Sequence, residues 1–190
     1  MQTLNQQTAG ARRFNAVEYH RMAAAGILSE DERTELIDGV IYSMPPAGAP
    51  HSGIVNLIVK YLLSVLNGRL YDVRFEEALS IDEHNEPVPD VMIAAPDLAN
   101  YTNVHPTPGD VQVVVEVADS SLSTDLNTKR KLYARVGIGE YWVVDVNARC
   151  LHRFTQPGLD GYGDERVLDA IAAIDFASTR LEIARFFPPA

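Results

Sequence analysis

The pattern of apolar and polar residues predicts a strand, a helix and a second strand in unbroken succession in the centre of the chain. The run from Val111 to Val117 is nearly all valine, which is typical of a strand covered on both faces. A helix is predicted from roughly Thr124 to Val136, and a strand from Tyr141 to Val146. We expect this helix to pack back across the first strand.

The amino-terminal part begins with a polar segment, residues 1–13, which we expect to be flexible. Asn15 and Glu18 have the spacing of a capping box that opens a helix, and Gly26 would end that helix. Asp38-Gly39 lies between two short apolar runs and is the common signature of a two-residue hairpin turn.

A second helix is predicted from Ile54 to Leu66, after a proline-containing link at residues 45–50 that should break regular structure. Residues 69–81 then read as extended, 82–86 as a turn, 88–95 as a strand and 96–109 as a loop. Beyond Arg149, residues 151–155 and 181–186 are expected to form strands or a terminal helix around a glycine-rich loop at 158–163. We expect this last part to be peripheral cover.

The composition fits one globular domain over residues 14–190, because 46% of the 190 residues are hydrophobic. The formal charge of −10 argues against a protein that coats nucleic acid by bulk electrostatics, although a local basic groove is compatible with it. Cys150 is the only cysteine, which excludes an internal disulfide and a cysteine-based zinc cluster and suits a reducing cytoplasm. The start lacks an apolar signal region and Lys60 interrupts the most apolar helix, so we expect a soluble, cytoplasmic protein without membrane contact.

Candidate chemistry begins with Glu116, which is embedded in the valine run. A carboxylate there must be desolvated, paired or bound to a cation. Asp90 lies near the start of the preceding predicted strand, so the two carboxylates are placed to converge and bind a hard divalent cation. Lys129, about one turn into the following helix, would then orient a water molecule or offset charge developing on a phosphoryl group.

Each of these residues also has a purely structural interpretation. Asp90 follows a proline and is compatible with a cap or a surface position. Glu116 is equally compatible with a structural partner for an arginine or lysine. Lys129 belongs to Lys129-Arg130-Lys131, which by default is a solvated helix face, and the neighbouring Leu132 and Tyr133 are expected in the core.

Several segments together resemble a known family: Pro89-Asp90, Glu116 to Ser120, Lys129 with Tyr133, Gly137, and Glu140 to Asp145. In this order and spacing they look like the large bacterial family of restriction-endonuclease-like proteins within the PD-(D/E)XK nuclease superfamily. The hairpin from Glu35 to Gly39 and His51 at the opening of the next helix are similar to that family's amino-terminal half. The resemblance covers the chain from about Phe14 to Asp145.

The resemblance implies an α/β (α+β) restriction-endonuclease-like core: a central mixed β-sheet flanked by helices, with an amino-terminal helix and β-hairpin. It implies an endonuclease dependent on Mg²⁺ or Mn²⁺ that hydrolyses DNA. Asp90 and Glu116 would be the metal ligands, Lys129 the catalytic lysine, and Glu35 an additional acidic residue. The sequence departs from the superfamily pattern at Ala118, where a lysine normally stands, so Lys129 is taken as the match and Lys131 as its less favoured substitute. For His51, a helix-entry, proton-accepting or packing role is open, and we favour one in support of the site.

A DNA substrate would require local positive charge, and Arg130, Lys131 and Arg135 form the obvious cluster beside Lys129. A homodimer is the default expectation, since many endonucleases of this type pair to cut two strands. The main alternative is a catalytically inactive nuclease-fold interaction module, also dimeric, in which Glu116 and Lys129 form a buried ion pair. A carboxylate pair of the kind that glycoside hydrolases use is a third reading, and no feature of the sequence favours it.

Overall fold

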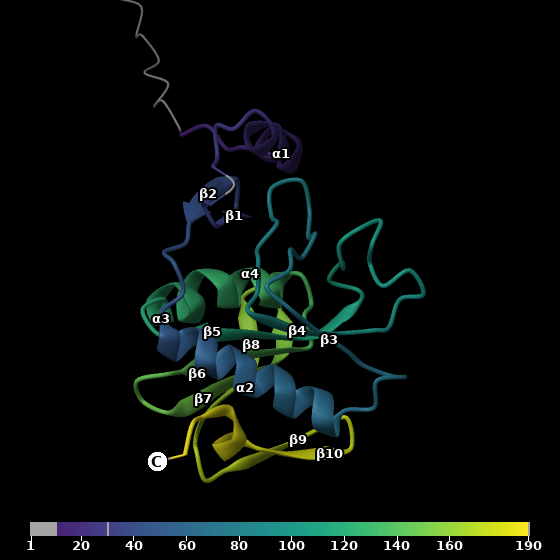
Figure 1. The fold of residues 1–190 in the computed structure, drawn as a ribbon, viewed down its shortest axis with the longest axis vertical. Coiled ribbons are helices and arrows are strands. Elements are labelled where there is room, and N and C mark those ends of the chain that lie inside the picture. Colours follow the sequence, from purple (N-terminus) through teal and green to yellow (C-terminus); the bar gives the residue numbers. More distant parts are fainter. Residues whose placement is uncertain (1–10, 30, 190) are drawn as a thin grey trace, which may run out of the picture.

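A six-stranded mixed sheet forms the centre of the molecule in the computed structural model, which describes residues 11–29 and 31–189 (Figure 1). Its strand order is β3-β4-β5-β6-β7-β8. The strands are β3 (Asp72–Phe75), β4 (Val91–Ala94), β5 (Val111–Ala118), β6 (Glu140–Asp145), β7 (Cys150–Gly158) and β8 (Gly161–Asp169). The predicted α/β (α+β) class, with a mixed sheet between helices, is confirmed.

Strands β5 and β6 run parallel, while the other neighbours in the sheet are antiparallel. A parallel pair needs a crossover connection, which here is a helical segment built from α3 (Leu122–Thr124), the π-helical turn η1 (Asp125–Lys129) and α4 (Arg130–Arg135). The sequence predicts one regular helix over most of this range. The structure corrects that expectation, because the π turn divides it.

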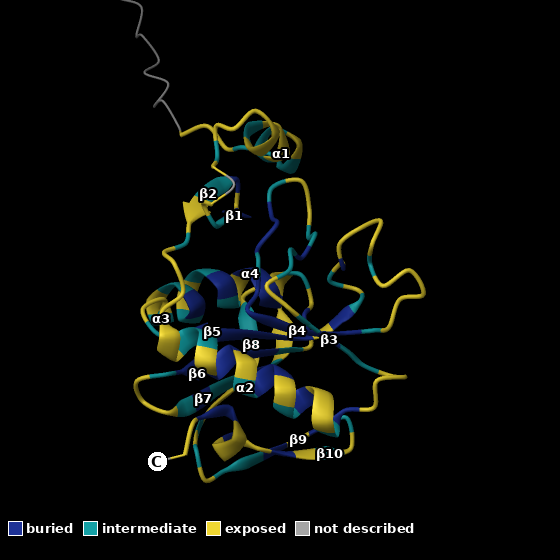
Figure 2. Ribbon diagram, in the orientation of Figure 1, coloured by how far each residue is buried: buried dark blue, intermediate teal, exposed yellow. Residues whose placement is uncertain are grey.

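Strand β5 is covered on both faces, as its valine run predicts. Side chains alternate along a strand, so Val113, Val115 and Val117 pack in the core beneath α2 (Ala49–Val65). Glu116 shares the other face with Val114 and packs towards the crossover helices. In Figure 2 the central strands are accordingly dark blue.

Helix α2 begins earlier than the sequence predicts. Pro50 lies in its first turn, where a missing backbone N–H leaves no hydrogen bond unmade, so the proline opens the helix instead of breaking it. The buried residues of α2 recur at helical spacing, from Ile54 to Leu62. They cover one face of the sheet.

The predicted amino-terminal helix and hairpin are confirmed. Residues 1–10, which belong to the segment expected to be flexible, lie outside the residues that the structure describes. Helix α1 (Ala16–Ala24) opens with the Asn15–Glu18 capping box. Strands β1 (Thr34–Ile37) and β2 (Val40–Ser43) form the hairpin, with Asp38 at φ 47° and Gly39 at φ 70°. In Figure 1 this hairpin stands apart from the central sheet.

The carboxyl-terminal part corrects the expectation of a glycine-rich loop at 158–163. Gly158 and Gly161 pair across a tight hairpin, and the strands that they join extend the central sheet. The peripheral cover comes afterwards, from β9 (Ala173–Phe176), β10 (Thr179–Glu182) and the 3₁₀ turn η2 (Ile183–Phe186). These elements close the same apolar core as α2.

Two further expectations are corrected in extent. Of the extended segment 69–81, only β3 joins the sheet, and of the strand predicted at 88–95 only β4 does.

Among the described residues, no helix has both the length and the apolar content needed to cross a lipid bilayer.

Candidate functional site

The sheet register brings Asp90 beside Glu116. Strand β4 pairs with β5 so that Val91 lies opposite Val115, and one further step along this register places Asp90 opposite Glu116. The backbone N–H of Val117 donates to Asp90 Oδ2 over 2.7 Å, which holds the aspartate against β5. The convergence expected from two successive strands is therefore present.

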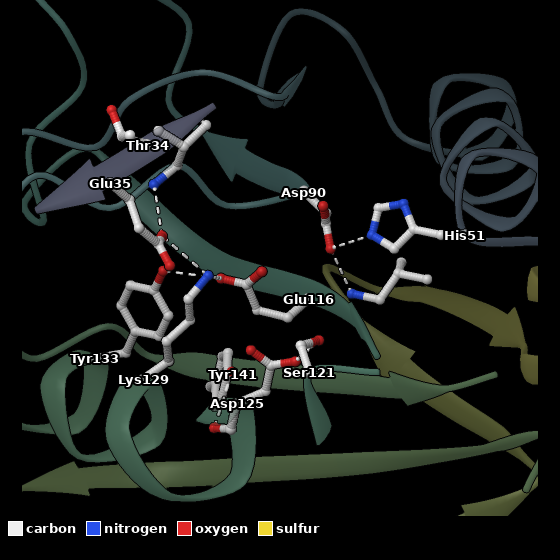
Figure 3. A network of polar contacts seen from close by, with 12 residues as sticks. Thr34, Glu35, His51, Asp90, Glu116, Ser121, Asp125, Lys129, Tyr133 and Tyr141 are labelled. Atoms are coloured by element: carbon white, nitrogen blue, oxygen red, sulfur yellow. Dashed lines mark hydrogen bonds and ion pairs between the residues drawn. The ribbon is translucent and has the colours of Figure 1, made fainter. Parts of the chain in front are cut away.

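Lys129 reaches the same place from the crossover helix. Its Nζ lies 3.0 Å from Glu116 Oε1 and 3.1 Å from Glu35 Oε2 (Figure 3). The hydroxyl of Tyr133 donates to the same Glu116 oxygen over 3.0 Å. Lys129 is 5% exposed, so it does not lie on a solvated helix face.

The helical segment faces the sheet with charged groups where the π turn lies. Asp125, Lys129 and Tyr133 are spaced four residues apart and are all buried, while Asn127 and Lys131 on the other side are exposed. Single π turns inside helices are rare and occur frequently at functional sites.

Glu35 is supplied by β1, which is not part of the central sheet. Leu36 and Glu86 exchange two backbone hydrogen bonds, of 3.2 and 2.8 Å, and thereby fasten the hairpin to the turn that precedes β4. Glu35 Oε2 accepts a hydrogen bond from the Val88 backbone N–H at 3.3 Å. The hairpin thus delivers a second carboxylate to the lysine, beside that of Glu116.

His51, in the first turn of α2, contacts Asp90 from the other side. Its Nε2 lies 3.2 Å from Asp90 Oδ2. Its Nδ1 is buried and, within residues 11–29 and 31–189, makes no hydrogen bond. The hydrogen bond to Asp90 raises the pKa of the imidazole, and burial opposes this effect. The histidine thus contacts Asp90, and its role, structural or in support of the site, stays a prediction.

These side chains surround a cavity of about 530 Å³ between the hairpin, α2 and the crossover. The acidic residues that line it outnumber the basic ones: Glu35, Asp90, Glu116, Asp119 and Asp125 face Arg33 and Lys129. Four of the five acids are at most 8% exposed. A concentration of buried carboxyl groups in one cavity needs positive charge to compensate it.

Burial, together with the neighbouring acids, raises several pKa values in the cavity. Burial is the largest cause that raises the pKa of Glu116, and Lys129 opposes it. Burial likewise raises the pKa of Asp125 to about 6. For Lys129, burial lowers the pKa, but the charges of Glu116 and Glu35 outweigh it and raise the pKa overall. The lysine therefore stays protonated, and Glu116 and Asp125 hold protons more tightly than usual.

The donor set fits a hard divalent cation. Asp90 and Glu116 each bind protein groups through one oxygen, and within the described chain the other oxygens, Oδ1 and Oε2, make no hydrogen bond. Mg²⁺ and Mn²⁺ prefer such carboxylate oxygens.

The predicted DNA-binding residues are not gathered into a free cluster. Arg130 pairs with Glu165 at 3.0 Å and lies over the Phe154 ring. Arg135 pairs with Asp38 at 2.8 Å, and Lys131 is exposed. None of the three lines the cavity.

Two residues of the site were missed by sequence reasoning. Asp125 stands four residues before Lys129, and this helical spacing was the available signal. Tyr133 is in the core, as expected, but also donates to Glu116. Its hydroxyl has no signature in the sequence, because a buried tyrosine fits an apolar helix face equally well.

Comparisons with known proteins agree with the fold. The family model Uma2, described as "Putative restriction endonuclease", matches residues 16–180. Among solved structures, the chain is similar to a crystal structure from Anabaena variabilis ATCC 29413, described as a putative nuclease belonging to DUF820. The two are 18% identical, with 83% of this chain and 90% of that chain covered and a TM-score of 0.69, a likeness that bears on the fold alone. Among curated proteins no match was found.

Proposed function

The chain belongs to the Uma2 family, whose model is described as "Putative restriction endonuclease", and from this premise we propose that it is a divalent-cation-dependent endonuclease that hydrolyses phosphodiester bonds in DNA. One observation carries the proposal: the buried carboxyl groups of Asp90, Glu116 and Glu35 lie in one cavity with the buried ammonium of Lys129. Acidic ligands beside an amine are the groups that phosphoryl transfer to water requires.

In this proposal Asp90 and Glu116 hold Mg²⁺ or Mn²⁺, and Glu35 completes the acidic set. A bound divalent cation polarises a phosphoryl oxygen and lowers the pKa of a water molecule. The cation also compensates the acidic cavity, so that a phosphate can enter it.

The chain's own residues contribute orientation and charge. Lys129 is fixed between Glu116 and Glu35, so its ammonium needs no reorganisation to meet negative charge that develops on the phosphoryl oxygens. His51 and the Val117 N–H fix Asp90 Oδ2. The hydroxyl of Tyr133 fixes Glu116.

DNA as the substrate and a homodimer as the active form are parts of the proposal that rest on the family. Lys131 is the exposed member of the proposed DNA-contacting set. Arg130 and Arg135 would have to exchange their partners Glu165 and Asp38 for phosphates. Such exchange at the surface costs little, because exposed ion pairs are weak.

A specific observation favours a second candidate function. The Glu116–Lys129 contact at 3.0 Å is also the buried ion pair expected of an inactive nuclease-fold interaction module. In that case the pair is a structural element and no cation is needed. The two candidates differ in whether a divalent cation binds at Asp90 and Glu116.

The test combines calorimetric titration with a cleavage assay. The proposal predicts that Mg²⁺ or Mn²⁺ binds to the full chain, that DNA is cleaved only with cation, and that Glu116→Gln loses both properties while keeping its circular dichroism spectrum. Glu182→Gln, at an exposed position outside the cavity, is the matched control and should behave like the wild type. Cleavage by a folded Glu116→Gln at the wild-type rate would refute the catalytic assignment. Failure of the wild type to bind either cation would favour the interaction module.

A further inference from the structure

A second group of metal-ligating side chains lies at the turn between β6 and β7. The register pairs Asp145 with Cys150, and His152 follows Cys150 by two residues, so all three side chains project from one face of the sheet. One ligand atom from each lies within 4.8 Å of the other two. The arrangement follows from strand pairing and does not depend on a flexible loop.

This group is separate from the carboxylate cavity. None of the three residues lines that cavity. In the register, Glu116 pairs with Val143 and Val143 with His152, so two strand spacings separate the histidine from the glutamate. Strand spacing is about 4.8 Å, which puts the backbones of His152 and Glu116 roughly 10 Å apart across the sheet, while Asp145 pairs with Ala118 on the adjacent strand.

The turn that carries Asp145 is held on two sides. Asp145 Oδ1 accepts a hydrogen bond from the Ala148 N–H at 2.8 Å. The Asn147 amide donates to the Asp119 carbonyl at 2.9 Å, and Arg149 donates to the Pro188 carbonyl at 2.8 Å. The ligand positions are therefore organised before any ligand arrives.

Polar atoms at the group are left without partners. His152 Nδ1 is buried and makes no hydrogen bond with the residues that the structure describes. Its Nε2 lies 3.8 Å from Cys150 Sγ, a weak contact at most. Asp145 Oδ2 makes no hydrogen bond to any described residue either. A buried polar atom without a partner is unfavourable, and a cation bound to Asp145 Oδ2 would give that oxygen a partner.

We propose that Asp145, Cys150 and His152 form a second cation site, selective for a borderline transition metal such as Zn²⁺. Carboxylate, thiolate and imidazole are the three ligand types that Zn²⁺ takes, and three protein ligands leave a fourth position for water or another ligand. Mg²⁺ avoids thiolate, so the two sites differ in the metal that they accept. A single cysteine excludes a zinc site built on several cysteines, but it does not exclude a mixed site of one aspartate, one cysteine and one histidine.

Cobalt is the probe for this site, because a Co²⁺–thiolate bond gives a charge-transfer absorption that carboxylate ligands do not. The full chain is kept reduced with a phosphine, supplied with excess Mg²⁺ and titrated with Co²⁺. We expect the band to saturate at one equivalent and to disappear on addition of Zn²⁺. Absence of the band in the wild type would overturn the proposal.

Variants assign the ligands. Cys150→Ser should abolish the band, and His152→Ala or Asp145→Asn should weaken Co²⁺ binding at least tenfold. Glu116→Gln should leave it unchanged, which separates this proposal from the proposed nuclease function. A second measurement covers the case in which Cys150→Ser does not fold: Zn²⁺ should protect Cys150 of the wild type, but not of His152→Ala, from alkylation. Equal Co²⁺ affinity in the wild type, His152→Ala and Asp145→Asn would reduce the site to an isolated thiol and refute it.

Discussion

Lys129 Nζ lies 3.0 Å from Glu116 Oε1, although one residue is on a helical crossover and the other on the strand before it. The contact is buried at both ends. The lysine therefore reaches the glutamate from the helix. Ala118, two residues after Glu116 in the strand, is fully buried.

The first prediction concerns the charge of Lys129. Lys129→Met should lower the free energy of unfolding by about 3 to 5 kcal/mol at pH 8, because it leaves Glu116 and Glu35 buried without their cation. Urea denaturation monitored by circular dichroism measures this. Lys131→Met, two residues away and exposed, should stay within about 0.5 kcal/mol of the wild type. Equal effects of the two substitutions would mean that the ion pair does not compensate the buried acids.

The second prediction concerns the pH dependence due to Asp125. Burial raises the pKa of Asp125 from 3.8 to about 6, so the folded state binds this proton more tightly than the unfolded state. Stability is therefore lost as the pH rises between these two values, and the full penalty is present above pH 6. Asp125→Asn should remove a penalty on the order of 3 kcal/mol at pH 8 and almost none below pH 4.

Urea unfolding with EDTA at both pH values tests this prediction. Asp160→Asn, at an exposed position on the β7–β8 turn, should show no such pH-dependent gain. The interpretation fails if Asp125→Asn is equally stabilised, or destabilised, at pH 4 and pH 8.

The third prediction concerns the pH dependence due to His51, which has the same sign as that of Asp125 because both pKa values are raised in the folded state. The hydrogen bond to Asp90 raises the pKa of His51 above 6.5, against the effect of burial. The resulting stabilisation is fully present below pH 6.5 and is lost as the pH rises through the folded-state pKa. His51→Gln should therefore be most destabilising in acid, with a loss that narrows towards alkaline pH.

His105→Gln is the control, since His105 is exposed in the loop before β5. The free energies of unfolding of both variants are compared across pH 5 to 9. A loss in His51→Gln that is constant with pH would show that the ring packs against Asp90 without sharing a proton with it.

Local sequence patterns identified charged residues that stand among apolar ones. Glu116 stands out because a carboxylate in a valine strand has to be compensated, and Asp90 follows from strand order. Lys129 lies about one turn into the helix, which puts it within reach of the two acids, but the same spacing also fits a solvated face, and the family resemblance favoured the site. Lys129 is buried at the end of the π turn, and this turn has no clear sequence signature.

Pairing between segments of the chain accounts for two features that the sequence did not predict. Arg135 looked free for DNA, but its partner Asp38 is 97 residues away on the hairpin. Residues 158–163 read as a glycine-rich loop, yet Gly158 ends β7 and Gly161 begins β8, and the pairing of these strands makes them part of the central sheet. For Arg135 the determining contact comes from a segment that no local window includes.

The last prediction tests whether the hairpin positions Glu35. Gly39 has φ +70°, and a Cβ there would lie 2.6 Å from Arg13 Cβ and 2.9 Å from the Phe14 carbonyl. Gly39→Ala should therefore lower stability by about 1 to 3 kcal/mol and shift the strand that carries Glu35. Gly53→Ala, in α2 with no atom within 4 Å of the added Cβ, should instead raise stability by about 0.5 to 1 kcal/mol.

If the hairpin holds Glu35 against Lys129, Gly39→Ala also weakens Mn²⁺ binding measured by calorimetry, while Gly53→Ala does not. Unchanged Mn²⁺ affinity in a destabilised Gly39→Ala would remove Glu35 from the proposed cation site and leave it a structural partner of the lysine.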